Sequence, residues 1–472
     1  MRNGDLSVAK WRTPFPMPYR LGLIGTDDIA GTREWEIIHE SFQVWQSCPD
    51  LSVSFAYAGT TDATDVAYDG QNSVIFVDNL GEGYLAATTV TALVRVINGS
   101  TVLEIVDADL RINDSASVQF LDGPSESWNR VSLKGVVVHE IGHMLGLHHT
   151  MAREATMWWL TRVGQETLDT DDIAGMAALY PAPAQPVQTA TIEGTVRIRR
   201  QDDTVEPYFG GNVLAVNCHT GKAVAADISR TWQDPGRHGR YRIQGLPPGV
   251  YAVYCEKTRS QFLSGGPLLQ PGGEVSTYYA SIPFPLFSPR CLGDGTSDPR
   301  AGQVVTLSAG QTLLNADIEI VEGATDVFDL PPGNDTPQYA VEIGDGSAVA
   351  SFIKNSVDVD YFTFNIDRPC MVYLTVECAQ SRFTDDVWEA VEEPDLYMTL
   401  YADDGETVLA QSDDHWFSDP YLYFRVRRPG RFYLKLADKS GNNVFDVDYL
   451  LCLSTTGGGP SGVPLEEWQH YD

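Results

Sequence analysis

Residues 139–149 read HEIGHMLGLHH, and this stretch decides the fold of the N-terminal part of the chain. An α-helix turns by about 100° per residue, so His139 and His143, four positions apart, lie on the same face. Gly146 allows the chain to leave the helix through a left-handed conformation, which brings His149 to the same place. We therefore predict a zinc site of three neutral imidazoles with one open tetrahedral position, which is typical of a catalytic zinc ion.

Glu140 directly follows the first histidine, so its carboxylate is expected beside the metal. Neutral ligands leave a zinc ion its full charge, and such an ion activates a water molecule and polarises a carbonyl group. We predict that Glu140 is the general base that takes a proton from the zinc-activated water and passes it to the leaving amine. The motif HExxH alone is a modest signal, but Gly146, His149 and the later Met157 make a coincidence much rarer.

The composition limits the architecture and the partners. A chain of 472 residues, 43% of them hydrophobic, can build about two to four domains. Lys and Arg number 32 against 64 Asp and Glu, so the net charge of −32 disfavours nucleic acid and anionic lipid surfaces as partners. We interpret the acidity as a solvated surface, with calcium (Ca2+) bound by some carboxylates as the alternative. No run of about 18 apolar residues occurs, which argues against membrane insertion.

The first residues and the cysteines bear on the compartment. Residues 1–7, MRNGDLS, lack the apolar core of a secretory signal, and we expect a secreted, extracellular protein whose signal peptide is not present in this sequence. The seven cysteines are spread thinly, which favours about one to three disulfides in stable domains over a disulfide scaffold. We expect Cys218 to pair with Cys255, and Cys370 or Cys378 to pair with Cys452.

Hydrophobic periodicity predicts both helices and strands in residues 11–181. Large apolar residues recur at helical spacing between Thr32 and Pro49, which predicts one helix. A second helix is expected at 132–145, with an apolar side opposite its histidines, and a third after Asp169, a good N-cap. Alternating apolar residues predict strands at 19–24, 51–55, 73–77, 85–96 and 107–113.

A proline-rich segment, residues 181–186, separates this region from one with few helix signals. Beyond it, short alternating strands separated by Gly and Pro turns predict two all-β sandwich domains. We expect a first domain at 1–182, a linker at 183–189, β-sandwich domains at 190–322 and 336–456 with a linker at 323–335 between them, and a flexible tail at 457–472.

The N-terminal region resembles the metzincin zinc metallopeptidases, and most closely their matrixin (matrix metalloproteinase-like) branch. The resemblance rests on HEIGHMLGLHHT at 139–150, ATM at 155–157, DAD at 107–109 and LDTDDIAGMAALY at 168–180, and it covers roughly residues 11–181. It implies an α+β catalytic domain, with a mixed twisted sheet and three helices. It also implies that His139, His143 and His149 bind one catalytic zinc ion (Zn2+), that Glu140 is the general base, and that Met157 forms the Met-turn, a hydrophobic floor beneath the site.

The same resemblance suggests where a substrate would lie. An extended peptide would pair with an edge strand that contains Leu85, Ala86, Ala87 and Thr88. Trp158 and Trp159 stand where matrixins usually carry Tyr-Pro, so the wall of the specificity pocket beside the zinc would differ from theirs. The sequence has no counterpart of the histidine-rich segment that holds a second, structural zinc in the family, and we expect a single zinc ion.

Two downstream segments show weaker resemblances. Residues 190–322, with IEGTV at 192–196 and YRIQGLPPGVY at 241–251, look like a carboxypeptidase regulatory-like β-sandwich. Residues 336–456, with VDYFTF at 359–364 and SDD at 412–414, are similar to a bacterial prepeptidase C-terminal domain. Such modules accompany secreted bacterial peptidases, where they act either as spacers or as binding surfaces for substrate or other surfaces.

The residues and the resemblance together predict a secreted, monomeric zinc-dependent endopeptidase that hydrolyses peptide bonds of protein or peptide substrates. One alternative is a metzincin of another branch, with the same chemistry and a different pocket. Another is a catalytically degenerate secreted adhesin or a carbohydrate- or protein-binding surface protein. The complete set of three histidines and Glu140 argues against a degenerate site.

Overall fold

The computed structural model describes most of the chain, and the described residues fall into two compact units, one up to residue 182 and one from residue 189 onward. The described residues are 9–12, 15–78, 80, 84–97, 100–115, 119–124, 130–150, 152, 154–158, 165–182, 189–229, 236, 238–256, 290–292, 304–323, 333–354, 357–378, 396–413, 420–439, 447–455 and 469–470.

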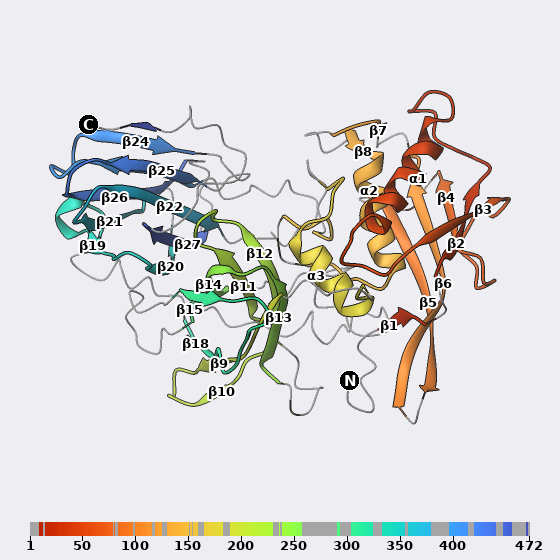
Figure 1. Cartoon of the computed structure of the whole chain (residues 1–472), viewed down its shortest axis with the longest axis horizontal. Coiled ribbons are helices and arrows are strands. Elements are labelled where there is room, and N and C mark those ends of the chain that lie inside the picture. The colour runs from red at the N-terminus through yellow and green to blue at the C-terminus, as the bar shows by residue number, and fades with distance from the viewer. Residues whose placement is uncertain are drawn as a thin grey trace. The chain divides into compact units, whose positions relative to one another are not determined.

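The first unit is built on a six-stranded mixed sheet (Figure 1). Its strands are β1 (Ala9–Trp11), β2 (Met17–Gly22), β3 (Phe55–Thr61), β4 (Ser73–Val77), β5 (Ala86–Ile97) and β6 (Ser100–Asn113). In the order β1-β6-β4-β2-β3 all neighbours run parallel, whereas β5 pairs antiparallel with β6. A separate short parallel pair consists of β7 (Gln119–Leu121) and β8 (Arg130–Ser132). The mixed sheet that the family resemblance implied is therefore present.

Strand β5 lies at an edge of this sheet, because within the described part of the chain β6 is its only partner. The two strands form a long ribbon that extends well past the other strands of the sheet (Figure 1). A bulge between Thr91 and Ala92 interrupts their register. Val90 packs against the core, whereas Val94 and Val96, beyond the bulge, are exposed. The predicted strand at 85–96 thus exists, with an unpaired edge among the described residues.

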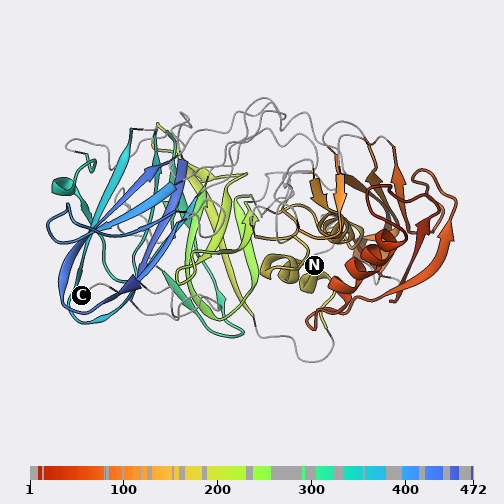
Figure 2. The same ribbon diagram turned by 90° about the horizontal axis from the view of Figure 1, so that it is seen from above.

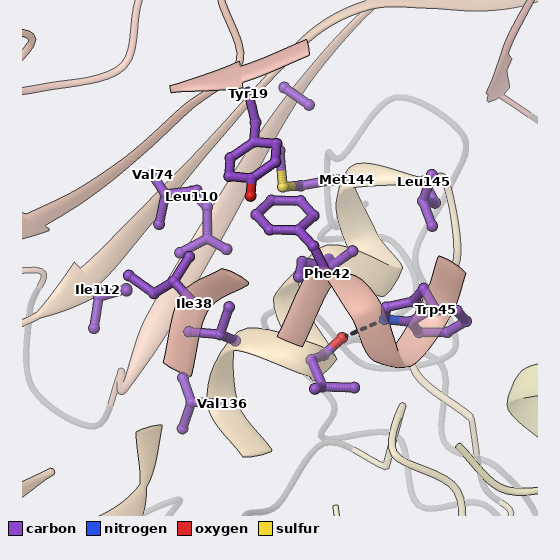
Figure 3. Packing of buried hydrophobic residues seen from close by; sticks show 14 of the residues in the cluster. Tyr19, Ile38, Phe42, Trp45, Val74, Leu110, Ile112, Val136, Met144 and Leu145 are labelled. Atoms are coloured by element: carbon purple, nitrogen blue, oxygen red, sulfur yellow. Dashed lines mark hydrogen bonds between the residues drawn. The ribbon is translucent and has the colours of Figure 1, made fainter. Parts of the chain in front are cut away.

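Helices α1 (Arg33–Gln46) and α2 (Leu133–Met144) lie side by side in both ribbon views (Figure 1, Figure 2). Ile38, Phe42 and Trp45 of α1 are fully buried in a core that also includes residues of the sheet and of α2 (Figure 3). The Trp45 indole Nε1 donates a hydrogen bond to the main-chain oxygen of Val138 at 2.9 Å. The apolar spacing noted in the sequence is therefore the face that packs against α2 and the sheet.

A third helix, α3 (Thr170–Leu179), follows the site region and begins where the sequence predicted. Asp169 is its N-cap and forms a capping box with Asp172. Among the described residues, no helix is both long and apolar enough to cross a membrane.

Trp11 connects β1 to the C-terminal end of α2. Its main-chain N–H donates to the Tyr180 hydroxyl at 2.8 Å, and its indole Nε1 donates to the main-chain oxygen of Met144 at 2.8 Å. The Tyr180 hydroxyl in turn donates to the main-chain oxygen of Leu145 at 2.8 Å. These buried hydrogen bonds hold the turn through which the chain leaves α2.

Two buried carboxylates on β6 hold the connection between β3 and β4. Asp107 accepts the main-chain N–H of Gly70 at 2.7 Å, and Asp109 accepts those of Ala67 and Ser73 at 3.0 and 2.9 Å. Burial raises the pKa of both carboxyl groups above its usual value. This connection therefore depends on two side chains that are distant from it in the sequence.

The second unit contains, among its described residues, four five-stranded sheets. The first comprises β9 (Ala190–Arg199), β10 (Val205–Pro207), β13 (Arg240–Leu246), β17 (Thr312–Leu313) and β18 (Ile318–Val321), and the second β11 (Asn212–Asn217), β12 (Ala223–Ile228), β14 (Gly249–Glu256), β15 (Arg290–Cys291) and β16 (Val305–Leu307). The third comprises β19 (Val341–Glu342), β21 (Val359–Ile366), β23 (Leu396–Tyr401), β24 (Val408–Ser412) and β26 (Gly430–Asp438). The fourth comprises β20 (Ala348–Ile353), β22 (Cys370–Cys378), β25 (Tyr421–Val426), β27 (Val447–Ser454) and β28 (Gln469–His470), and a short 3-10 helix, η2 (Pro337–Tyr339), precedes β19.

Three apolar clusters join these sheets. The first and second sheets share one cluster, and the third and fourth share another. Side chains alternate along a strand, so Val213 and Ala215 of β11 lie in the first of these clusters while Leu214 and Val216 face the other way. The outward-facing residues form a third cluster with Ala348 and other residues of the fourth sheet. The second and fourth sheets are thus buried on both faces along part of their length.

The predicted strand at 51–55 is wrong for most of its length. Strand β3 begins only at Phe55, and Leu51 makes an isolated bridge to Pro181. The Ser52 N–H donates to the main-chain oxygen of Tyr180 at 2.9 Å. This segment therefore pairs with the end of the first unit instead of with the sheet.

The expected disulfides are also wrong. None of the cysteines Cys218, Cys255, Cys370 and Cys452 forms a disulfide bond, which excludes pairing of Cys218 with Cys255 and any pairing of Cys452. Cys218 lies in the cluster between the second and fourth sheets, whereas Cys255 lies in the cluster between the first and second sheets. The two thiols therefore face different cores. The side chain of Cys378 lies outside the described part of the chain.

Candidate metal and catalytic site

Helix α2 carries three of the predicted site residues in its last two turns. Ser132 begins the helix as its N-cap and accepts a hydrogen bond from the Gly135 N–H at 3.1 Å. His139 and His143 follow at the predicted helical spacing, with Glu140 between them. The opposite side of α2 is apolar and fully buried, so this helix can point its polar side chains in only one direction.

The three predicted histidines converge. The Nε2 atom of His149 lies 3.1 Å from Nε2 of His139 and 3.2 Å from Nε2 of His143. The ligand atoms of all three lie within 4.8 Å of one another. Zinc bound to imidazole nitrogens at tetrahedral angles places those nitrogens about 3.3 Å apart. The two separations from His149 are therefore close to the value that a zinc ion requires.

Hydrogen bonds determine which nitrogen of two histidines is protonated. Nδ1 of His139 lies 2.7 Å from the main-chain oxygen of Thr156, and Nδ1 of His143 lies 2.9 Å from that of Leu147. A carbonyl oxygen only accepts, so each Nδ1 must carry the proton and each Nε2 presents a lone pair. These lone pairs point toward one another, which favours a cation between them.

Burial also keeps the imidazoles neutral. It lowers the pKa of His139 to about 3, with a smaller contribution from the neighbouring His143, and it lowers the pKa of His143 as well. Neutral imidazole is the form that binds a metal. The next residue along the chain, His148, is exposed and lies outside the group of converging nitrogens.

Gly146 is essential to the turn that brings His149 back. Its φ of +102° lies in the region that glycine adopts readily and other residues do not. A Cβ at this position would lie 2.5 Å from the main-chain oxygen of Ala9 and 3.2 Å from Cδ1 of Ile105. Both the conformation and the close packing therefore require glycine.

Met157 packs against helix α2 beside Gly142, the residue that precedes His143. Its side chain is 2% exposed and packs so closely on α2 that a Cβ at Gly142 would lie 2.3 Å from the Met157 Sδ atom. Asp172 of α3 holds the main chain at Met157, because its carboxylate accepts hydrogen bonds from the N–H groups of Thr156 and Met157 at 2.7 and 2.9 Å. Burial raises the pKa of Asp172 to about 6.

The Glu140 side chain is 6% exposed, and its carboxylate oxygen Oε2 accepts a hydrogen bond from the Thr88 hydroxyl at 2.6 Å. Burial raises the pKa of Glu140 to about 7, and the bond from Thr88 acts in the opposite direction. Thr88 belongs to the edge strand β5, together with Ala86 and Ala87, and Leu85 directly precedes this strand. The structure therefore places the predicted base against the predicted substrate strand.

Of the two tryptophans that follow Met157, the structure describes only Trp158. Trp158 is buried, and its main-chain oxygen accepts a hydrogen bond from Nε2 of Gln165 at 3.1 Å. Trp159 lies outside the described residues. The part of the pocket wall predicted from this pair therefore stays a prediction.

Sequence reasoning missed the groups that orient the site. By residue type, Asp172 is simply an acidic residue in the first turn of α3, where a carboxylate favours the helix N-terminus. The carbonyl groups of Thr156 and Leu147, which fix the histidine tautomers, leave no trace in residue type because every residue has one. Only the capping-box spacing of Asp169 and Asp172 signals in the sequence that Asp172 bonds to main-chain groups.

Comparison with protein families gives a match to the N-terminal region. The family described as matrixin matches residues 10–181. The hatching enzyme of Paracentrotus lividus is 28% identical over 197 residues, which are 39% of this chain and 29% of that protein. Metalloendoproteinase 2-MMP of Arabidopsis thaliana is 37% identical over 76 residues, which are 16% of this chain and 20% of that protein. The chain thus spans less than a third of the length of either relative.

Part of the chain is also similar to solved structures. The pre-peptidase C-terminal domain of a collagenase from Bacillus anthracis shares 16% identity, with a TM-score of 0.20. The similarity covers 24% of this chain and 94% of that domain.

Proposed function

We propose that this chain, which carries a matrixin domain at residues 10–181, is a zinc-dependent endopeptidase that cleaves protein or peptide substrates. The observation that carries the proposal is the convergence of three Nε2 atoms, from His139, His143 and His149, together with the buried carboxylate of Glu140 on the same helix as two of them. A fortuitous cluster of histidines would not require two carbonyl groups to set the tautomers.

His139, His143 and His149 would hold one zinc ion through Nε2. Bound there, zinc would act as a Lewis acid that polarises the scissile carbonyl and makes water more acidic. Met157 would support the ligands from below, and the carbonyl groups of Thr156 and Leu147 would keep them oriented.

Glu140 would act as the general base. Its carboxylate would take a proton from the attacking water and deliver it to the leaving amine, so the residue ends the cycle ionised as it began. Its burial excludes bulk water from the carboxylate, which keeps proton transfer within the site.

The substrate would bind as an extended strand along residues 85–88, at the start of β5. The start of β5 at Ala86–Thr88 lies beside Glu140, and its outer edge is unpaired among the described residues. Main-chain hydrogen bonds from an edge strand hold a peptide in a fixed register without selecting its side chains. We infer that selectivity for substrate side chains comes from the pocket that Trp158 and Trp159 would help to shape.

We further propose that the second unit comprises two β-sandwich domains, at 190–322 and 336–456, whose function is to bind a substrate or a surface. Paired sheets that enclose apolar clusters support this division. Acidic composition and a peptidase activity favour a secreted monomer that works outside the cell.

The test compares zinc-loaded wild type with Glu140→Ala on casein and on a mixed peptide library. We expect wild type to cleave both and to stop when a chelator is added. Glu140→Ala should lower kcat at least about 100-fold while one zinc ion per chain stays bound, because the base is removed and the ligands are not. His149→Ala, the matched control, should lose the metal.

Two outcomes would contradict the proposal. Wild-type protein with one zinc ion that cuts neither casein nor the library is not an endopeptidase, and its site then serves binding alone. Loss of zinc from Glu140→Ala would instead show that this carboxylate is a ligand.

A further inference from the structure

The Thr88 hydroxyl faces two acceptors on one residue. It lies 2.6 Å from Oε2 of Glu140 and 3.1 Å from the main-chain oxygen of Glu140. A hydroxyl group has a single proton to donate, and a bond to a carboxylate is stronger than a bond to a carbonyl group. The shorter contact is therefore the hydrogen bond, and it joins the edge strand directly to the proposed base.

Thr88 is well suited to hold a group in place. Its side chain is β-branched, so it loses little rotational freedom when its hydroxyl is fixed. Strand β5 pairs with β6 on one side, with Thr88 opposite Leu110, a fully buried residue. Strand β5 also contacts α2, the helix that carries Glu140. The strand that carries the Thr88 hydroxyl and the helix that carries Glu140 are therefore both held in place by neighbouring elements.

We propose that Thr88 is a positioning residue that holds Oε2 of Glu140 against the substrate strand, which leaves Oε1 to transfer the proton. This inference rests on the proposed function of Glu140 as the general base. The link has a consequence for substrate binding, because the strand that would carry the peptide also fixes the distance between base and scissile bond. A base free to rotate would spend part of its time in orientations from which it cannot reach the water.

A purely structural role would have a different signature. If the hydroxyl only satisfied a buried carboxylate, its loss would lower the stability of the fold without a specific effect on turnover. Positioning instead predicts a loss in kcat with little change in KM, because binding of the peptide does not require Glu140. It also predicts that any hydroxyl in this place restores function.

The experiment measures kcat and KM for Thr88→Val, which keeps the shape and removes the hydroxyl, and for Thr88→Ser, which keeps the hydroxyl. We expect Thr88→Val to lower kcat roughly 10- to 100-fold with KM within about twofold of wild type. Thr88→Ser should return kcat to within about threefold of wild type. Thr91→Val is the matched control, because strand alternation turns that residue to the other face of β5. It should behave as wild type.

Two further readouts separate this inference from general damage. Adding Thr88→Val to Glu140→Ala should not lower the residual rate further, because a residue that acts through Glu140 has nothing to position once the carboxylate is gone. Crystal structures should show one orientation of the Glu140 side chain in wild type and in Thr88→Ser, and more than one in Thr88→Val. Zinc content should be one ion per chain in all of them.

The outcomes distinguish this inference from the proposed function. Chelator-sensitive cleavage that Glu140→Ala abolishes establishes the function first, and a Thr88→Val variant with wild-type kcat then overturns only the role of Thr88. Failure of Thr88→Ser to restore kcat also overturns it, since the hydroxyl would not be the active group. A further loss of about tenfold in the double variant would mean that Thr88 acts by another route.

Discussion

At Gly142, the absence of a side chain allows α2 to lie directly on Met157. A Cβ there would lie 2.3 Å from the Met157 Sδ atom and 3.1 Å from Cζ2 of Trp45. We expect Gly142→Ala to displace Met157 and to lower the free energy of unfolding by about 1–3 kcal/mol, as overpacking commonly does. The expected loss of stability is opposite to the effect of helix propensity, by which alanine stabilises a helix relative to glycine.

Gly135 provides the matched control, because it lies in the same helix with more space. A Cβ there would lie 3.6 Å from Cβ of Ser132 and 3.7 Å from Cβ of Gln165, which are ordinary contacts. Gly135→Ala should leave stability unchanged or raise it by up to about 1 kcal/mol. Urea unfolding of both variants measures the difference in their free energies of unfolding. Equal values would show that the Met157 side chain can move aside without loss of stability.

At the scale of elements, Asp109 joins β6 to the connection between β3 and β4. In Asp109→Asn, the amide would present its NH2 group to the N–H of Ala67 or of Ser73, so one hydrogen bond is lost. We expect the free energy of unfolding to fall by about 1–3 kcal/mol. Urea denaturation of wild type and variant gives this difference directly.

The same substitution changes how stability depends on pH. Burial raises the pKa of Asp109 in the folded protein, so between its unfolded and folded pKa values the folded state binds more protons than the unfolded state. This carboxyl group therefore makes wild type less stable as pH rises through that window, and asparagine cannot titrate. The amount by which wild type is more stable than Asp109→Asn should therefore become smaller as pH rises from the unfolded-state pKa to the folded-state pKa of Asp109. A difference that grows with pH would contradict this sign.

The elements themselves were predictable where one local pattern dominates. The apolar spacing of α1, the N-cap of α3 and the alternation of β4 all predicted elements at nearly the observed bounds. The segment before Phe55 alternates just as well, yet Ser52 pairs with Tyr180. Alternation shows that a segment can be a strand but not which partner it meets, and here a distant partner decided.

At the scale of the whole chain, the second unit depends on a cluster that joins its second and fourth sheets. Ala348 of β20 is fully buried in this cluster, near Leu214 and Leu450. We expect Ala348→Asp to lower the melting temperature of the second unit strongly, because an unpaired carboxylate would be buried between two sheets. Calorimetry should show the effect as an earlier or a split transition, since the two pairs of sheets would no longer stabilise each other.

Val408→Asp is the control for this experiment. It places the same charge in the same unit at a residue that is 51% exposed, so the melting temperature should change little. An equal loss in both variants would mean that charge alone, and not the cluster, accounts for the change.

Much of the site followed from the order of residues alone. Helical periodicity places His139 above His143, Gly146 permits the return of His149, and Glu140 follows the first ligand by necessity of the covalent chain. These relations span about ten residues, so local geometry is sufficient to predict them. The cysteines show the limit of such reasoning, because Cys218 and Cys255 were expected to pair from the sequence but face different cores in the folded chain.

Contacts between distant segments decided everything that orients the site. The hydroxyl of Thr88 reaches Glu140 across 52 positions, and Asp172 reaches Met157 across 15. No local pattern specifies such contacts, because they depend on which strand lies beside which helix once the core has formed. The identity and spacing of the metal ligands are thus determined by one short stretch of sequence. The orientation of Glu140 and the contacts that hold Met157 arise only when distant segments meet in the folded chain.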